Sequence, residues 1–264
     1  MTQTDGLAAA FGTIAEEYDR VRPGWPPAAI EIAARRLRLS RGAAVLDLAA
    51  GTGKLTRALL RRFDDVTAVE PLAGMREVLA RELPAARVVD GAAEAIPLPD
   101  TSVEAVFCGE AFHWFDAPRA AAEIARVLRP GGGVAVLYNR RDWNASAHAW
   151  QRECHAAFEA HKLPRDHSLG HGDGGWRAPL EAALGPLADD ETPYAITLRA
   201  VDLVALYGTF STIAGLPTGR RDAALEAIRG VLDRHGIAEA EVAYRTEIAT
   251  ALRAREPAAP EADG

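Results

Sequence analysis

Residues 45–56, which read VLDLAAGTGKLT, contain the pattern that decides the fold. An apolar run over residues 43–48 passes into a loop of small residues, and a helical pattern follows. A buried parallel strand, a glycine turn and a helix produce this pattern. Gly51 and Gly53 permit torsions that other residues avoid, and they let a ligand come close to the backbone. The stretch therefore predicts a site for a nucleotide-like molecule at the end of a strand.

Two features of this loop argue against a dinucleotide cofactor. The dinucleotide fingerprint requires a third glycine after two intervening residues, and Thr56 stands at that position. Asp47 lies near the strand end, where its charge would repel a pyrophosphate but suit an ammonium group or hydroxyls. A nicotinamide-dependent oxidoreductase is therefore disfavoured and is kept as a second alternative.

A second acid follows the next expected strand. Residues 66–69 read VTAV, and Glu70 and Pro71 come directly after them. Glu70 would lie at the carboxyl end of this strand, the edge at which open α/β sheets bind ligands. A carboxylate at that edge can accept hydrogen bonds from both hydroxyls of a ribose.

These features resemble the class I S-adenosylmethionine-dependent methyltransferases, and three later segments agree with that family in order. Residues 90–100 (DGAAEAIPLPD) resemble its adenine-binding loop, residues 102–108 (SVEAVFC) its fourth strand, and residues 123–132 (EIARVLRPGG) the helix and turn before its fifth strand. The resemblance implies an α/β, Rossmann-like fold. Its sheet would have seven strands, mostly parallel with an antiparallel last strand, with helices on both faces and a helical cap.

The pattern along the chain predicts five parts. We expect a lid or cap over residues 1–40, a cofactor-binding Rossmann-like core over 41–138 and a helical insertion that caps the substrate over 139–190. Residues 191–253 would complete the core sheet, and residues 254–264 would form a flexible tail. Strand and helix patterns alternate in the core, which implies right-handed crossovers and a parallel sheet.

The resemblance also implies which residues hold S-adenosylmethionine and its product S-adenosylhomocysteine. Asp47 would face the ammonium of the methionine half, and Glu70 would bind the ribose. Ala92 stands where relatives often carry an aspartate, so the backbone of the adenine loop would read the adenine edge. The full cofactor-binding set comprises Tyr18, Arg22, Asp47, Ala49, Gly51, Gly53, Glu70, Pro71, Met75, Ala92, Ala93, Glu94 and Glu110.

Residues 109–116, which read GEAFHWFD, follow the fourth strand, where the transferred methyl group should lie. This segment resembles the methyltransferase subgroup that includes trans-aconitate methyltransferase, and it suggests Phe112, His113 and Trp114 as substrate-binding residues. His113 is a candidate base or acceptor-orienting residue because its ordinary pKa lies near neutrality. Its alternative role is that of a packed side chain with one satisfied nitrogen.

The N-terminal residues 18–23 resemble the segment that closes over the cofactor in the same subgroup. Arg22 offers a guanidinium fork for the carboxylate of methionine or of a substrate. The alternative for Arg22 is a surface ion pair.

The implied reaction is in-line methyl transfer to a small molecule, with a carboxylate or hydroxyl as acceptor. Positioning and desolvation would lower the barrier. A protein that binds S-adenosylmethionine as a sensor or scaffold, without turnover, is the first alternative. Ala49 stands where such loops usually begin with glycine, and we expect Ala49→Gly to leave cofactor binding nearly unchanged.

Composition excludes several other classes. The net charge of -7 and the lack of a basic run argue against nucleic-acid binding. We expect no membrane span and a cytoplasmic location, since we identify no long apolar segment and no signal peptide. We also expect a monomer or a homodimer. Cys108 and Cys154 are too few for a disulfide framework. The spacings of His161, His167, His171 and Asp173 match no structural zinc pattern, so we predict no metal.

Overall fold

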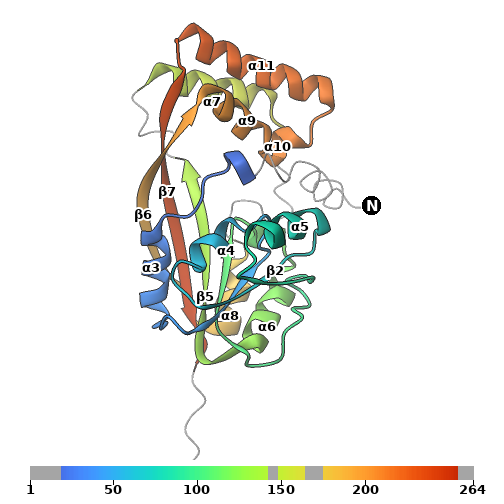
Figure 1. Ribbon diagram of the computed structural model, residues 1–264, viewed down its shortest axis with the longest axis vertical. Coiled ribbons are helices and arrows are strands. Elements are labelled where there is room, and N and C mark those ends of the chain that lie inside the picture. Colours follow the sequence, from blue (N-terminus) through green and yellow to red (C-terminus); the bar gives the residue numbers. More distant parts are fainter. Residues whose placement is uncertain (1–18, 142–147, 164–174, 255–264) are drawn as a thin grey trace, which may run out of the picture.

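A mixed sheet forms the centre of the computed structural model, which describes residues 19–141, 148–163 and 175–254 (Figure 1). The strands are β1 (Ala44–Leu48), β2 (Asp65–Val69), β3 (Arg87–Val89), β4 (Val103–Gly109), β5 (Leu128–Arg141), β6 (Ala188–Arg199) and β7 (Glu239–Leu252). The helices are α3 (Pro27–Arg36), α4 (Lys54–Leu59), α5 (Ala73–Glu82), α6 (Ala117–Val127), α7 (Ala149–His161), α8 (Arg177–Leu184), α9 (Ala200–Gly208), α10 (Ser211–Ala214) and α11 (Thr218–Arg234), with a short 3-10 turn η1 (Phe112–Trp114).

The topology of the sheet confirms the predicted fold class. Its strand order is β3-β2-β1-β4-β5-β7-β6. Strands β1 to β5 pair in parallel, and β7 runs antiparallel to both of its neighbours, β5 and β6. The order reverses between β1 and β4, so the sheet has its topological switch point there. Ligands of open α/β sheets bind at this point, outside the carboxyl ends of the strands.

Helices cover both faces of the sheet because its central strands are apolar on both sides. In β1, Val45 packs in one hydrophobic cluster with α3 and α4, while Leu46 packs in the other with α6 and α8. Buried parallel strands carry such continuous apolar runs. Asp116 starts α6 by accepting a hydrogen bond from the backbone N–H of Arg119 at 3.3 Å, and a proline lies in the first turn.

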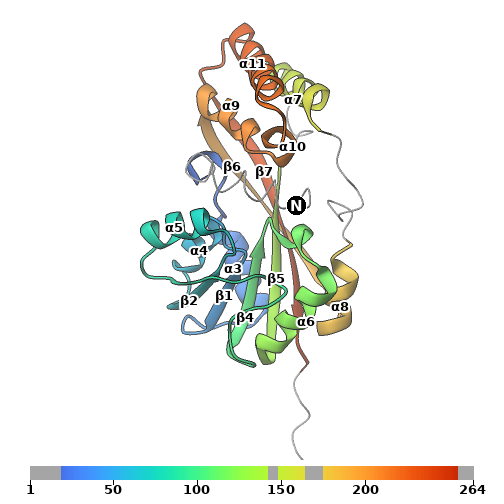
Figure 2. The same cartoon turned by 90° about the vertical axis from the view of Figure 1, so that its right-hand side faces the viewer.

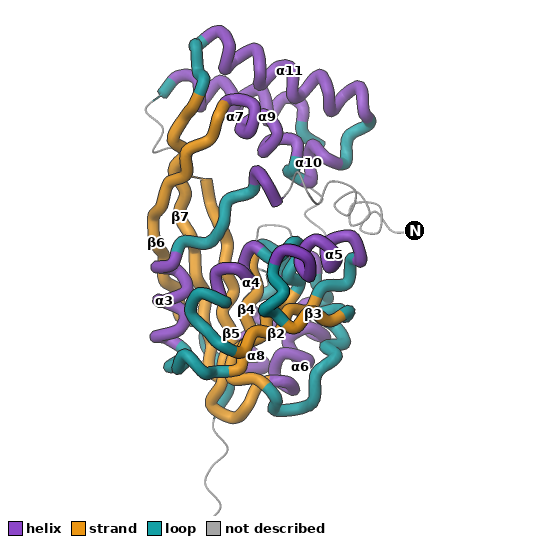
Figure 3. Tube along the Cα trace, in the orientation of Figure 1, coloured by secondary structure: helices purple, strands orange, loops and turns teal. Residues whose placement is uncertain are grey.

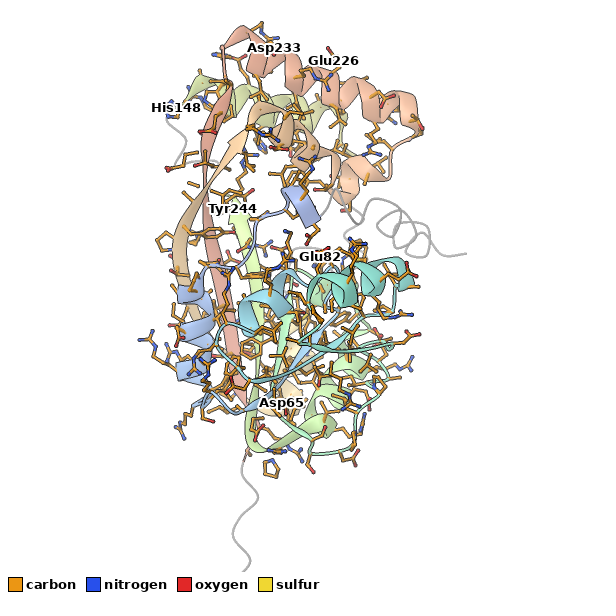
Figure 4. The ribbon with its side chains drawn as sticks, viewed as in Figure 1. Asp65, Glu82, His148, Glu226, Asp233 and Tyr244 are labelled. Carbon is orange, nitrogen blue, oxygen red and sulfur yellow. The ribbon has the colours of Figure 1, made fainter. Side chains whose placement is uncertain are left out.

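Three long strands extend the sheet beyond the core. Strands β5, β6 and β7 have 14, 12 and 14 residues, and they lead toward a helical lobe made of α7, α9, α10 and α11 (Figures 2 and 3). This helical lobe has its own cluster of buried side chains, including Cys154, Leu206, Tyr207 and Ile228. Figure 4 shows Tyr244 of β7 between the sheet core and the helical lobe.

The observed division of the chain differs from the expected one in three places. Residues 139 and 190, the expected limits of the insertion, fall inside β5 and β6. Helix α8 packs on α6 in the core, so only α7 of that insertion belongs to the helical lobe. Helix α3 is likewise part of the sheet core rather than a cap. Residues 1–18 of the expected lid and 255–264 of the expected tail lie outside the described residues.

Candidate active site

The glycine loop joins β1 to α4 at the carboxyl edge of the sheet. Ala49, Gly51 and Gly53 have φ angles of 58°, 58° and 91°, in the left-handed region that favours glycine. A Cβ atom on Gly53 would lie 2.8 Å from Leu83 Cδ1, so this glycine is needed for the close packing of α5. Gly51 has only Met75 Sδ near its Cβ position, at 3.6 Å. The positive φ thus favours glycine at both positions, and at Gly53 the nearby side chains of Leu79 and Leu83 also leave little room for a Cβ atom.

Ala49 adopts the left-handed conformation despite its methyl group. A left-handed L-residue costs about 1–2 kcal/mol, and glycine removes this cost but adds about 0.5–1 kcal/mol of unfolded-state entropy. We expect Ala49→Gly to change the free energy of unfolding by less than about 1 kcal/mol and the affinity for S-adenosylhomocysteine by less than twofold. Urea unfolding and titration calorimetry measure the two quantities. A tenfold change in affinity would show that the position of Ala49 in the loop is misassigned.

Asp47 is buried at the end of β1, with 1% of its surface exposed. Thr56 of α4, itself buried, donates its hydroxyl to Asp47 Oδ2 at 2.5 Å. The other oxygen, Oδ1, is buried without a hydrogen-bond partner in the described part of the chain. Burial raises the pKa of Asp47 from its ordinary 3.8 to about 7, and the charge of Glu70 raises it further while Thr56 opposes the shift. A cationic ligand group would satisfy this orphan oxygen.

Glu70 lies at the carboxyl end of β2, and both of its carboxylate oxygens are oriented by the backbone. Oε2 accepts the N–H of Gly51 and Oε1 accepts the N–H of Leu72, each at 2.9 Å. Burial raises the pKa of Glu70, and the two backbone hydrogen bonds oppose that shift. Glu70 is thereby tied to the glycine loop, so the predicted contact with the ribose lies next to the predicted contacts with the methionine half.

The predicted adenine loop is held mainly by backbone and core contacts. Ala93 is buried in the core, and the backbone of Ala92 closes a turn on Ala95 at 3.2 Å. Glu94 accepts the N–H of Asp116 at 2.9 Å, so its carboxylate joins this loop to the segment after β4. Met75 is buried beneath the glycine loop, and Pro71 is exposed beside Glu70.

The segment after β4 contains a second strained residue. Glu110 has a φ of 56°, and its Oε1 accepts the N–H of Asn139 of β5 at 2.5 Å. Burial raises the pKa of Glu110, whereas the Asn139 N–H and the cations Arg22 and Arg140 lower it. A non-glycine residue in this conformation costs about 1–3 kcal/mol and is often found at functional sites. Glu110 is thus placed at the switch point, beside the predicted acceptor position.

His113 lies in an aromatic cluster on the α6 and α8 face of the sheet. Its Nδ1 is 3.4 Å from the hydroxyl of Tyr138, and its ring centroid is 5.1 Å from that of Trp114. The guanidinium of Arg140 stacks 4.6 Å above the Tyr138 ring and pairs with Glu247 at 3.0 Å. Burial raises the pKa of Tyr138, so its hydroxyl stays protonated at neutral pH. The cluster combines a titratable imidazole, a phenol and a cation.

Phe112 follows β4 as expected, but its side chain is buried. Its side chain is fully buried among core residues, with ring centroids 5.1 Å from Phe115 and 5.4 Å from Trp176. In this structure the side chain of Phe112 packs into the core, which disagrees with the expectation that it contacts substrate. His113 and Trp114, both half-buried, are better placed for that contact.

Arg22 lies in a connecting segment, residues 19–26, that joins the helical lobe to the core. Its Nε donates to the Thr209 hydroxyl at 2.9 Å and its Nη2 to the Thr209 carbonyl at 2.8 Å. The guanidinium also stacks 4.6 Å from the Phe210 ring centroid. These contacts hold Arg22 against the helical lobe, and its role toward a ligand carboxylate stays a prediction. Tyr18 lies outside the described residues.

Two residues of this region were not identified from the sequence. Asp19 accepts the hydroxyl of Thr52 at 3.1 Å and pairs with Lys54 Nζ at 3.6 Å, so the connecting segment is tied to the glycine loop. Tyr138 is the hydrogen-bonding neighbour of His113 from a different strand. Neither contact follows a local spacing rule, because the partners come from distant parts of the chain.

No group of three or more potential metal ligands occurs within residues 19–141, 148–163 and 175–254. His167, His171 and Asp173 fall outside these ranges. Within the same ranges, none of the helices has both the length and the apolar character needed to cross a membrane. Cys108 and Cys154 are buried free thiols.

Comparison with known proteins agrees with this geometry. A solved structure from Anaeromyxobacter dehalogenans, described as a candidate type II methyltransferase, superposes with a TM-score of 0.65 at 22% identity, and the match covers 89% of this chain and 99% of that one. The profile of the methyltransferase domain family matches residues 46–136. An uncharacterized methyltransferase of Mycobacterium tuberculosis (strain ATCC 25618 / H37Rv) is 46% identical over 151 residues. Residues 46–136 of this chain therefore form a methyltransferase domain.

The match to the mycobacterial methyltransferase covers 56% of this chain and 58% of that protein, so it spans little more than half of either. A malonyl-[acyl-carrier protein] O-methyltransferase of Halorhodospira halophila is 33% identical over 213 residues, 76% of this chain and 66% of that protein. The class I fold also occurs in the [4+2]-cyclase SpnF, with a TM-score of 0.55, 16% identity and coverage of 97% and 98%. Fold alone therefore does not determine what a member of this family does.

Proposed function

We propose that this methyltransferase transfers a methyl group from S-adenosylmethionine to an oxygen of a small molecule, either a carboxylate or a hydroxyl. The observation that carries the proposal is the pair of buried acids, Asp47 and Glu70, on either side of the glycine loop. The orphan Oδ1 of Asp47 suits an ammonium, and the fixed carboxylate of Glu70 suits ribose hydroxyls. These acceptors fit the ammonium and the ribose hydroxyls of S-adenosylmethionine.

When bound, the cofactor supplies a sulfonium methyl that is already activated for transfer. The residues of this chain then have to orient the acceptor and exclude water. His113 and Trp114 follow the switch-point strand, and Arg22 and Arg140 bring positive charge close to Glu110 in the same region. The name of the Halorhodospira relative, an O-methyltransferase acting on a malonyl group, supports a carboxylate acceptor.

Labelled cofactor tests this proposal directly. Purified protein is incubated with S-adenosylmethionine carrying a tritiated methyl group and with separate panels of carboxylic acids, phenols, alcohols and amines. We expect label in an ester or an ether, and base hydrolysis distinguishes the two. Transfer to amines alone would refute an oxygen acceptor. Calorimetric binding of the cofactor without transfer to any panel would favour a sensor or scaffold, and no binding would refute both.

Replacing His113 with glutamine distinguishes the two oxygen acceptors. A hydroxyl acceptor must lose a proton, so we expect kcat to fall about 10²–10⁴-fold if His113 removes that proton. A carboxylate is already ionised, and His113→Gln should then change kcat less than about fivefold. His148→Gln is the matched control, because His148 is exposed near the helical lobe (Figure 4). An equal effect of both substitutions would show that His113 does not act at the acceptor site.

A further inference from the structure

Arg76 has no role in the proposed reaction, yet it joins the two loops expected to hold the adenosine half of the cofactor. It lies on α5, directly after the buried Met75. Its Nη1 donates to the carbonyls of Glu70 at 3.0 Å and Pro71 at 2.6 Å. Its Nη2 donates to Asp90 Oδ2 at 3.1 Å. One guanidinium thus binds the turn after β2 and the loop after β3.

The charge of Arg76 also lies between two acids. The positive charge lowers the pKa of Glu70, while the negative charge of Asp90 raises it. Without Arg76, no cation from this position would offset the repulsion between the carboxylates of Glu70 and Asp90. The guanidinium therefore satisfies backbone carbonyls and screens a repulsion at the same time.

Asp90 is the first residue of the predicted adenine loop, and its contacts argue against a direct role in reading adenine. Its side chain is 70% exposed, and Arg76 binds both of its oxygens, at 3.0 Å and 3.1 Å. Arg76 itself is only 21% exposed. The half-buried arginine is thus the fixed member of the pair, and Asp90 anchors the loop to it.

We propose that Arg76 is a positioning residue that holds the carboxylate of Glu70 in register with the adenine-binding loop, and so sets the affinity for the adenosine half of the cofactor. This inference rests on the proposed use of S-adenosylmethionine. Because Arg76 spans two loops, its loss should lower the affinity for any ligand that carries adenosine. This loss of affinity should not depend on the methionine half of the ligand, which Asp47 faces.

Titration calorimetry with two probes tests this role. S-adenosylhomocysteine carries both halves of the product, and 5′-methylthioadenosine carries the adenosine half without the amino acid. We expect Arg76→Ala to weaken both probes by about the same factor, roughly tenfold. The matched control is Arg81→Ala, on the same helix, where the arginine is exposed and pairs with the neighbouring Glu82 at 3.0 Å.

Two further variants separate positioning from simple charge and from misfolding. Lysine keeps the charge but cannot form the planar fork, so Arg76→Lys should recover only part of the lost affinity. If Arg76 merely neutralised Asp90, the double variant Arg76→Ala, Asp90→Asn would regain wild-type affinity, and the positioning role would be wrong. Thermal unfolding of each variant checks that the fold is retained.

The outcomes distinguish this inference from the proposed function. If the wild-type protein binds neither probe, the proposed use of the cofactor fails. If the wild type binds both and Arg76→Ala binds them within twofold of it, only the role of Arg76 fails. A loss seen for S-adenosylhomocysteine but not for 5′-methylthioadenosine would also overturn the inference, because the effect would then lie in the methionine half.

Discussion

Replacing Glu70 with alanine is expected to lower the affinity for S-adenosylhomocysteine by about a hundredfold or more. A hydrogen bond to a charged group contributes about 1.5–3 kcal/mol, and Glu70 is placed to accept two from a ribose. The substitution also leaves the N–H groups of Gly51 and Leu72 without their acceptors. The glycine loop and the turn after β2 would then lose the group that joins them. Titration calorimetry measures the loss.

Two other variants show whether the effect of Glu70 comes from its charge and its contacts. Glu70→Gln keeps the shape of the side chain but presents an NH2 to one of the two backbone donors, so we expect an intermediate loss. Glu77→Ala is the matched control, because Glu77 is exposed on α5. If Glu70→Ala bound the ligand within threefold of wild type, Glu70 would not contact the ribose.

Replacing Asp47 with asparagine is expected to make the ligand-free protein more stable at pH 8 and to weaken ligand binding. Burial raises the pKa of Asp47 from 3.8 to about 7. The folded protein therefore prefers the protonated acid, and wild-type stability falls as the pH rises from about 4 to 7. A shift of this size corresponds to up to about 4 kcal/mol above pH 7. Asparagine does not ionise, so its advantage should be largest at pH 8 and shrink toward pH 5.

Ligand binding should show the opposite dependence on Asp47. An ammonium favours the ionised acid, so wild-type affinity for S-adenosylhomocysteine should rise between pH 6 and pH 8, with proton release below pH 7. Calorimetry in buffers of different ionisation enthalpy measures that release. Asp47→Asn should bind at least tenfold more weakly at pH 8, without this proton release.

Asp65→Asn provides the control for Asp47. Asp65 is exposed at the start of β2, at the opposite end of the sheet from the glycine loop (Figure 4). We expect this variant to follow the wild type in both stability and binding. Wild-type binding that is independent of pH between 6 and 8 would contradict the placement of the ammonium at Asp47.

The sequence by itself determined the edge of the sheet at which we propose that the cofactor binds. The strand, the glycine loop and the helix over residues 44–59, with Glu70 after the next strand, follow local patterns of burial and turn chemistry. Parallel strands bring their carboxyl ends to one edge, so Asp47 and Glu70 had to lie near each other once β1 and β2 paired. The seven mostly parallel strands and the antiparallel last strand came from the family resemblance, and the structure confirms them.

Only the tertiary structure determined which side chains surround the proposed acceptor site. The contact of His113 with Tyr138 spans 25 positions and depends on how the turn after β4 meets β5. The contact of Arg22 with Thr209 spans 187 positions and depends on the helical lobe that the long strands β5 to β7 carry. Phe112 and His113 are adjacent in the sequence, yet one is fully buried and the other is half-buried. Such outcomes depend on packing between distant segments, which a local sequence pattern does not encode.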